Sequence, residues 1–240
     1  MDLNSLKKTD DTIVADSIKV INKILSFSDL KPIELHIRED LQDLLPIDQF
    51  EKVNILSREE IKAIKGEKFH KGAIASFSSP KVFDQQGIES PFVILNGVTS
   101  PENVGSIVRT IAGLGFKSLV FDEKSCSPLV RRAIRVSMGN IIFLKVHHIS
   151  DLKDYLKSTP FKVYATANEP DSINLYDWEP SNECGFIIGS EGHGIDKEIF
   201  PLCHATLRIP ISENVHHLNA AQACAITASW IHSKNLLLNR

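Results

Sequence analysis

Three segments of the chain each carry a short apolar run into polar and glycine residues that could bind a ligand. They cover residues 91–110, 185–195 and 205–225. In the first, Asn103 and Gly105 precede apolar residues at helical spacing, so Arg109 should lie one to two turns into a helix, close to a strand end. A guanidinium placed there can hold a phosphate group through two parallel hydrogen bonds. Together the three segments predict one divided ligand site.

Each of these segments should begin as a buried strand, because its apolar run is short and rich in β-branched and aromatic residues. Open α/β sheets bind ligands at the carboxyl ends of their strands. The intervening sequence predicts further strands over 118–121, 141–146 and 161–166. Helices are predicted over 103–114, 128–138 and 151–158, and one more helix follows the third segment. This alternation predicts an α/β domain with a mostly parallel sheet.

A second, smaller α/β unit is predicted ahead of this domain. Residues 12–27 place apolar side chains at helical spacing, and residues 32–37, 52–56 and 70–77 have the composition of strands. Ser57 and Glu60 have the spacing of a capping box, which opens a helix. The proline-containing stretch that follows has no sustained period. We therefore expect domains over residues 1–80 and 91–240, joined by a linker over 81–90.

The order and content of the three segments resemble the SpoU (TrmH-type) branch of the SPOUT superfamily. Its members are RNA ribose 2′-O-methyltransferases that use S-adenosylmethionine. The resemblance spans roughly residues 91–240, and residues 135–139 resemble the family's segment after its second strand. The matching motif residues are Asn103, Gly105 and Arg109, then Gly189, Glu191, Gly192 and Gly194, and finally Ile209, Pro210, Leu218 and Asn219.

The resemblance implies a role for each part of the site. It makes Arg109 the essential arginine, and anchoring a phosphate suits arginine better than acting as a base, because its pKa is high. The other implied catalytic residues are Asn103, Glu191 and Asn219. S-adenosylmethionine would be bound by Gly189, Ser190, Gly194, Ile209, His217 and Leu218. Glu191 could hold either Arg109 or a ribose hydroxyl group, and Asn103 and Asn219 could position both through amide hydrogen bonds.

The resemblance also implies a SPOUT-type sheet with a carboxy-terminal trefoil knot, and a homodimer. The first domain is similar to the small ribosomal-protein-like domain that binds RNA ahead of SpoU catalytic domains. His70 and Gly72 lie in the stretch that matches the closing strand of that domain. The alternative is that these two residues only shape the end of a strand.

Two positions depart from the family pattern. His217 stands where serine commonly precedes the Leu-Asn pair, and Ser190 stands where asparagine is frequent. His217 could replace the serine as a donor, alter substrate choice or mark reduced activity. Two alternatives therefore stay open: a non-catalytic RNA-binding protein that keeps the fold, and a small-molecule methyltransferase. At single positions, Asn103 could be a helix N-cap and Arg109 could form a surface salt bridge.

The charge of the chain limits how it can contact RNA. With a net charge of −3 over 240 residues and a pI near 6.3, it cannot coat nucleic acid by bulk charge. Contact with ribosomal or transfer RNA must then be local. The best candidates are Arg131, Arg132 and Arg135, of which the first and third share a helix face. The alternative is a merely solvated helix face.

The sequence argues against several other classes of protein. The four cysteines form no C-x-x-C pair, so we expect neither a disulfide framework nor structural zinc. His147 and His148 would point to opposite faces of a strand, so we expect no metal. Neither a G-x-S-x-G nor a G-x-G-x-x-G motif is complete. No apolar run approaches the ~20 residues that span a bilayer, and no signal-type start is present, so we expect a cytoplasmic protein.

Overall fold

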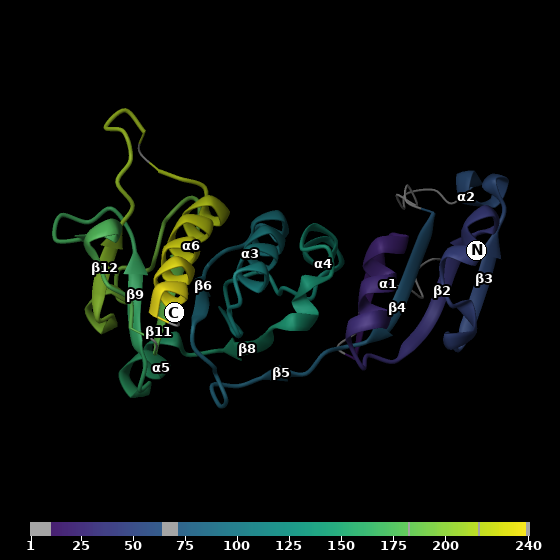
Figure 1. Cartoon of the computed structure of the whole chain (residues 1–240), viewed down its shortest axis with the longest axis horizontal. Helices are drawn as coiled ribbons and strands as arrows, with labels where there is room; N and C mark the ends of the chain where they lie inside the picture. The colour runs from purple at the N-terminus through teal and green to yellow at the C-terminus, as the bar shows by residue number, and fades with distance from the viewer. Residues whose placement is uncertain (1–10, 64–71, 182, 216, 239–240) are drawn as a thin grey trace. The chain divides into compact units, whose positions relative to one another are not determined.

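The computed structural model describes residues 11–63, 72–181, 183–215 and 217–238. The chain divides into two compact units (Figure 1). The first comprises residues up to Pro80 together with Leu129–Ile142, and the second comprises Lys81–Pro128 together with the chain from Phe143 onward. The expected strand over 70–77 is described from Gly72, and its His70 lies outside the described residues.

The first unit is a four-stranded sheet with short helices. The strands lie in the order β1 (Thr12–Asp16), β4 (Ala73–Ser78), β2 (Pro32–Arg38) and β3 (Lys52–Leu56). Strands β2 and β3 run parallel, and the other pairs are antiparallel. The helices are α1 (Ile18–Phe27), α2 (Arg58–Ala63) and α4 (Arg131–Val136), with 3-10 turns at η2 (Glu39–Leu44) and η3 (Ile47–Gln49). Helix α1 packs on β1 and β4, and α4 packs on β1.

The predicted helix over residues 12–27 is wrong in its first third. Residues 12–16 form strand β1, which pairs with β4, and α1 begins only at Ile18. Ser17 between them has φ 82°, so the chain turns sharply there. The β-branched side chains of Thr12, Ile13 and Val14 suit a strand, and pairing with β4 outweighs their helical spacing.

The predicted capping box at the start of α2 is confirmed. The Ser57 hydroxyl oxygen accepts a hydrogen bond from the Glu60 backbone N–H at 3.2 Å, and the Glu60 carboxylate accepts one from the Ser57 N–H at 2.8 Å. Two N–H groups that a helix start leaves unpaired are thereby satisfied.

The second unit is built on an eight-stranded sheet in which every neighbouring pair is parallel, which confirms the predicted mostly parallel α/β fold. The spatial order is β10-β12-β9-β11-β6-β7-β8-β5. The strands are β5 (Val82–Phe83), β6 (Phe92–Asn96), β7 (Ser118–Asp122), β8 (Lys145–Ile149), β9 (Lys162–Thr166), β10 (Ile173–Asn174), β11 (Cys184–Gly189) and β12 (Ala205–Arg208). Strand β5 lies within the stretch expected as a linker.

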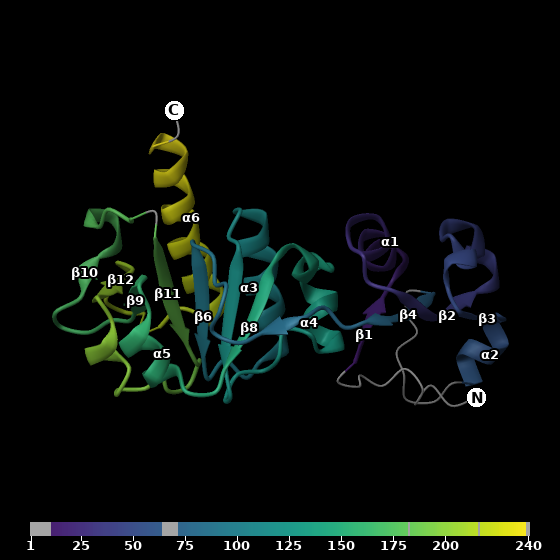
Figure 2. The ribbon, with the colours of Figure 1, turned by 90° about the horizontal axis from the view of Figure 1, so that it is seen from below.

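Helices cover both faces of this sheet. Helix α6 (Ala220–Leu238), the predicted final helix, lies beside α3 (Pro101–Gly113) on one face (Figure 1). Helix α5 (Leu152–Ser158) lies on the opposite face (Figure 2). The remaining turns are η4 (Asn140–Phe143), η5 (Leu175–Asp177) and η6 (Phe200–Leu202). Within the described residues, no helix is long and apolar enough to cross a bilayer.

Alternate residues of the central strands pack against opposite layers. Ile94 and Ile187 belong to the core cluster that includes Leu152 of α5. The Phe186 ring contacts Phe116, which follows α3, with ring centroids 6.0 Å apart. Every residue of β6 and β7 is buried, as expected for parallel strands covered on both faces.

The predicted strand over 141–146 is displaced along the chain. Asn140–Phe143 form the turn η4, and β8 begins at Lys145, opposite Ser118 of β7. Gly139 before the turn has φ 75°, a conformation that ends helices and is open to glycine. The predicted helix over 128–138 is correspondingly short, since α4 ends at Val136.

Since the strands run in one direction, their carboxyl ends lie at one edge of the sheet. The first motif follows β6, the second follows β11, and the third follows β12. Strands β6 and β11 are neighbours in the sheet, and β12 is separated from β11 by β9 alone. The fold therefore gathers the three motifs at one edge.

Candidate active site

Three of the four residues expected to be catalytic form a hydrogen-bonded cluster. The Asn103 amide nitrogen donates to the Glu191 carboxylate. The Asn219 amide nitrogen donates to the Asn103 amide oxygen at 3.1 Å. One residue comes from each motif, so the three motifs meet at this point. We refer to these residues as the Asn-Glu-Asn cluster.

The start of α3 leaves the Asn103 side chain available for this contact. Ser100 is the N-cap residue, and its hydroxyl accepts a hydrogen bond from the Asn103 backbone N–H at 3.3 Å. Pro101 occupies the first turn, where its missing N–H costs nothing. The alternative interpretation of Asn103 as the helix N-cap is therefore wrong, and its carboxamide contacts Glu191 and Asn219 instead.

The second motif folds as a tight turn at the end of β11. Ser190 and Gly194 exchange two backbone hydrogen bonds of 3.0 Å, and the Ser190 hydroxyl accepts one from the His193 N–H at 3.2 Å. A Cβ atom on Gly189 would lie 2.2 Å from the backbone carbon of Gly194, so this approach requires glycine. The turn carries Glu191, which is exposed apart from its contact with Asn103.

The third motif supplies a residue with two structural roles. The Asn219 side-chain oxygen accepts a hydrogen bond from the Ala221 N–H at 2.9 Å at the start of α6, while its amide nitrogen donates to Asn103. Ile209 and Leu218 are half-buried, whereas His217 is exposed. The half-buried pair can therefore offer apolar surface to a ligand at this edge of the sheet.

Arg109 lies on the exposed side of α3 and outside the Asn-Glu-Asn cluster. It follows Asn103 by six residues, which is about 9 Å along a helix axis. Among the described residues the Arg109 guanidinium forms no hydrogen bond or ion pair, so neither a contact with Glu191 nor a surface salt bridge is found there. Its guanidinium is thus available to an anion from outside the chain.

Two of the three arginines expected to bind RNA contact a buried carboxylate. Arg131 Nε lies 2.8 Å from Asp16 Oδ1, and Arg135 Nη1 lies 3.6 Å from Asp16 Oδ2. Asp16 is only 5% exposed. These ion pairs join α4 to β1, whereas Arg132 is exposed. RNA binding by the three arginines stays a prediction.

Replacing Asp16 with asparagine should lower the free energy of unfolding by about 2 kcal/mol, because two partly buried guanidinium groups lose their counter-charge. Urea unfolding would measure this loss. The control is Asp40→Asn, since Asp40 pairs with Arg38 and Arg58 in the same unit but is 38% exposed. That substitution should cost much less, because water screens exposed ion pairs. Equal losses in the two variants would contradict a structural role for Asp16.

A polar network that the sequence did not single out lies at the ends of β6 and β7. The Asn96 amide nitrogen donates to Asp122 Oδ2 at 2.8 Å and to Asp196 Oδ2 at 3.1 Å, and its oxygen accepts from the Asp196 N–H at 2.8 Å. Lys124 Nζ lies 2.8 Å from Asp196 Oδ2. We call these four residues the Asn96 network. The sequence did contain a signal for this network, since a polar residue directly follows each of two predicted strands.

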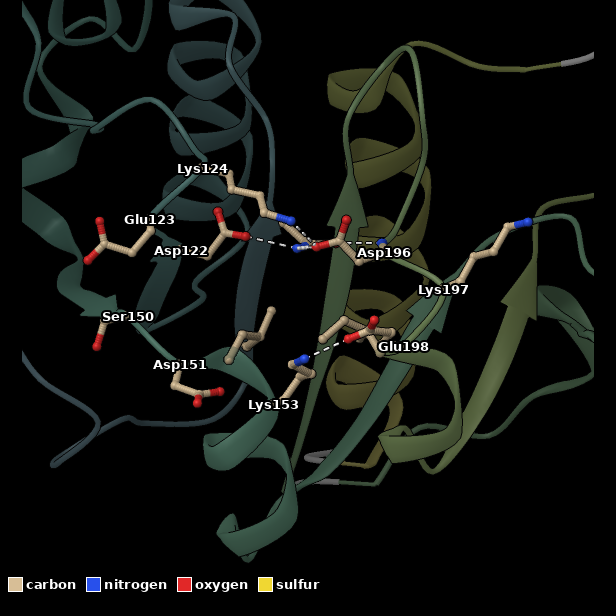
Figure 3. Close-up of a pocket in the computed structure, with 12 residues that line it drawn as sticks. Asp122, Glu123, Lys124, Ser150, Asp151, Lys153, Asp196, Lys197 and Glu198 are labelled. Atoms are coloured by element: carbon tan, nitrogen blue, oxygen red, sulfur yellow. Dashed lines mark hydrogen bonds and ion pairs between the residues drawn. The ribbon is translucent and has the colours of Figure 1, made fainter.

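The Asn96 network borders a cavity of about 480 Å³ (Figure 3). On its far side, Lys153 Nζ lies 2.6 Å from Glu198 Oε2. Figure 3 shows Lys124 pointing toward Asp196 and Lys153 toward Glu198. Hydrogen bonds from Lys124 and Asn96 hold the pKa of Asp196 below its usual range. Two of the lysines that line the cavity are thus paired with carboxylates of the same lining.

The adjacent histidines of β8 contact different partners. The His147 ring is buried beside Phe83, and its Nδ1 donates to the Asp84 carbonyl oxygen at 2.7 Å. His148 lies against Phe121, with Nε2 3.5 Å from Glu123. Within the described ranges no group of three or more His, Cys, Asp or Glu residues is placed to hold a metal ion, and His216 lies outside those ranges.

Acid should destabilise the fold partly through His147. Burial lowers the pKa of His147, although its hydrogen bond to the Asp84 carbonyl acts in the opposite direction. As pH falls below about 6.5, the unfolded chain therefore binds a proton that the folded chain resists, and the free energy of unfolding decreases. His147→Phe should reduce this decrease, measured by urea unfolding between about pH 7.5 and pH 5.5. An unchanged pH dependence would contradict the role assigned to His147.

The comparisons with known proteins point to one family. A model of the SpoU rRNA Methylase family matches residues 90–229, which is more than half of the chain. The 23S rRNA (guanosine-2′-O-)-methyltransferase RlmB of Coxiella burnetii is 24% identical over 228 residues, which cover 87% of this chain and 90% of that protein.

Solved structures of this kind share the fold. The SpoU methyltransferase AviRb from Streptomyces viridochromogenes, in complex with AdoMet, has a TM-score of 0.82 at 18% identity, over 97% of this chain and 96% of that chain. The AdoMet-bound rRNA methyltransferase from Sinorhizobium meliloti has a TM-score of 0.80 at 18% identity, over 93% of this chain and 87% of that chain. With its family motifs gathered at one edge of the matching sheet, the chain belongs to the SpoU rRNA methylase family.

Proposed function

We propose that the protein transfers a methyl group from S-adenosylmethionine to a ribose 2′-hydroxyl of ribosomal or transfer RNA. The observation that carries this proposal is the convergence of Asn103, Glu191 and Asn219, one from each family motif, beside the glycine turn of the second motif. The relative from Coxiella burnetii is named for 2′-O-methylation of guanosine in 23S rRNA, and the two structural neighbours are described with AdoMet bound.

The residues at this edge of the sheet fit the cofactor. The turn between Gly189 and Gly194 brings two stretches of backbone close together, and such stretches can bond the polar edge of an adenine ring. Half-buried apolar side chains can cover the faces of the ring. The residues proposed to hold the cofactor are Gly189, Ser190, Gly194, Ile209, His217 and Leu218. When bound, S-adenosylmethionine supplies an activated methyl group on a sulfonium.

The polar residues of the site bind the substrate, position it and accept its proton. Arg109 holds a substrate phosphate, because its guanidinium is exposed and can donate two parallel hydrogen bonds to an anion. Glu191, oriented by Asn103, accepts a hydrogen bond from a ribose hydroxyl and can draw its proton away as the oxygen takes the methyl group. Asn219 keeps Asn103 in place. Alignment of the hydroxyl is the main contribution of such a site.

We extend the proposal to the rest of the molecule. The first unit, which has its own sheet and core, recruits the RNA, and the Arg131, Arg132 and Arg135 helix contributes through its exposed positions. The protein acts in the cytoplasm as a homodimer, and its carboxy-terminal region is knotted. The resemblance to the SpoU family supports the recruiting unit, the dimer and the knot. The shared helix face of Arg131 and Arg135 supports the RNA contact, and the similarity to an rRNA methyltransferase supports the cytoplasmic role.

The proposal is tested by incubating the protein with labelled S-adenosylmethionine and total RNA from a strain that lacks it. Digestion to nucleosides should locate the label on the ribose oxygen. DNA and free nucleosides serve as competing substrates. Methylation of free nucleosides alone would favour a small-molecule methyltransferase. Absence of transfer to any substrate, with cofactor binding intact, would favour a non-catalytic RNA-binding protein.

A further inference from the structure

Asn96 joins three loops that arise from different parts of the second unit. Its own loop leads from β6 into α3, Asp122 is the last residue of β7 before the next loop, and Asp196 follows the turn of the second motif. Asn96 is 3% exposed and uses both amide hydrogens and the carbonyl oxygen in these contacts. Asp122 Oδ1 completes the junction by accepting from the Gly97 N–H at 3.1 Å.

The geometry points to Asn96 as a positioning residue for methyl transfer: it fixes the turn of the second motif against the loop of the first and so sets the contact between Glu191 and Asn103. Asn103 follows Asn96 by seven residues, and Glu191 precedes Asp196 by five. A shift at the junction is therefore passed to both ends of the Asn103–Glu191 contact over short lengths of chain. The catalytic part of this inference rests on the proposed function.

The ion pairs around the cavity cannot fix the turn alone. In the pair Lys124–Asp196 the side chains are 66% and 46% exposed, and in Lys153–Glu198 they are 52% and 74% exposed. Exposed pairs of this kind contribute little to stability, because water screens their charges. Asn96, by contrast, is buried, so losing its hydrogen bonds leaves desolvated groups unpaired.

Asn96→Asp is the sharpest test, because it keeps the shape of the side chain and removes both donors. The new carboxyl group would face Asp122 and Asp196, with Lys124 as the neighbouring cation. Repulsion between these carboxylates should raise the pKa of the introduced group. Acid would then protonate the introduced carboxyl group and restore one hydrogen-bond donor. Lower pH should therefore partly reverse the loss of activity.

The expected result is a fall in kcat/KM of about 10–100-fold near neutral pH, with a smaller loss relative to the unmodified protein as pH is lowered. The double variant Asn96→Asp with Asp122→Asn should recover part of the activity. Its new amide at position 122 could donate to the new carboxylate at position 96 and still accept from the Gly97 N–H. Glu198→Gln, an exposed change at the same cavity, should stay within about twofold of the unmodified protein.

Hydrogen exchange gives a readout that does not depend on activity. The backbone N–H groups of Gly97 and Asp196 should exchange faster in Asn96→Asp than in Glu198→Gln, since they bond within the Asn96 network. If the unmodified protein transfers no methyl group, the proposed function fails while exchange still decides the positioning role. Unchanged exchange, or equal activity in Asn96→Asp and Glu198→Gln, would overturn the inference. If Asn96→Asp does not fold, the double variant becomes the test. Its failure to regain both the fold and the activity would then overturn the inference.

Discussion

Replacing Arg109 with alanine should lower kcat/KM for RNA methylation by about 10²–10³-fold, the range seen when a donor to developing charge is removed. The side chain is exposed on α3, so its loss leaves the core intact. It also lies outside the turn of the second motif and the third motif, so the affinity for S-adenosylmethionine should change less than about twofold. Methyl-transfer kinetics and calorimetric titration of the cofactor measure the two effects.

Two further variants separate the shape of the guanidinium from its charge. Arg109→Lys keeps a positive charge but loses the planar fork, so its activity should fall between that of the unmodified protein and that of Arg109→Ala. Lys157→Ala removes an exposed cation from α5 and should have little effect. If Arg109→Ala retains more than half of the activity, another residue must hold the substrate phosphate.

The sheet of the second unit follows from the sequence because its strands are buried on both faces. Continuous apolar runs such as Phe92–Asn96 and Cys184–Gly189, each ending at polar or glycine residues, define both the strands and the edge where the motifs meet. Strand β1 is different, since it forms through pairing with β4 about 60 residues later. The spacing of apolar residues within 12–27 does not indicate that this segment pairs with β4.

The residues of the candidate site could be named from their motifs, and amide hydrogen bonds from Asn103 and Asn219 could be expected, but the partner of each residue could not. Glu191 was expected beside Arg109 or a ribose hydroxyl, and the structure places it against Asn103, 88 residues away. That choice depends on how the turn between Ser190 and Gly194 aims the side chain. A sequence shows the glycines that permit such a turn, not the direction in which the turn points.

For the arginine-rich helix and the Asn96 network, too, the sequence indicates the residues but not all of their partners. The spacing of Arg131 and Arg135 correctly places them on one helix face, yet their partner Asp16 lies 115 residues from Arg131. Asn96 and Asp122 end adjacent strands, so their proximity could be expected from the parallel sheet. The contribution of Asp196 could not, because it requires the chain beyond β11 to fold back toward β6.

Adding one methyl group at Gly189 should disrupt the proposed cofactor site far more than adding one at Gly192. An alanine Cβ at Gly189 would lie 2.2 Å from the Gly194 carbon and 2.4 Å from the Ile195 nitrogen. Both are backbone atoms, so the two arms of the turn must separate. Overpacking of this kind costs about 1–3 kcal/mol, and Gly189→Ala should fall at the upper end.

A Cβ at Gly192 meets nothing within 4 Å, which makes Gly192→Ala the matched control for stability. Because the turn bonds Ser190 to Gly194 directly above Gly189, opening it should also weaken S-adenosylmethionine binding by about tenfold or more, or about 1.4 kcal/mol. Urea unfolding and calorimetric titration of both variants measure the two effects. Loss of stability in Gly189→Ala with cofactor affinity unchanged would mean that the turn supports the fold and that the cofactor is held elsewhere along the sheet edge.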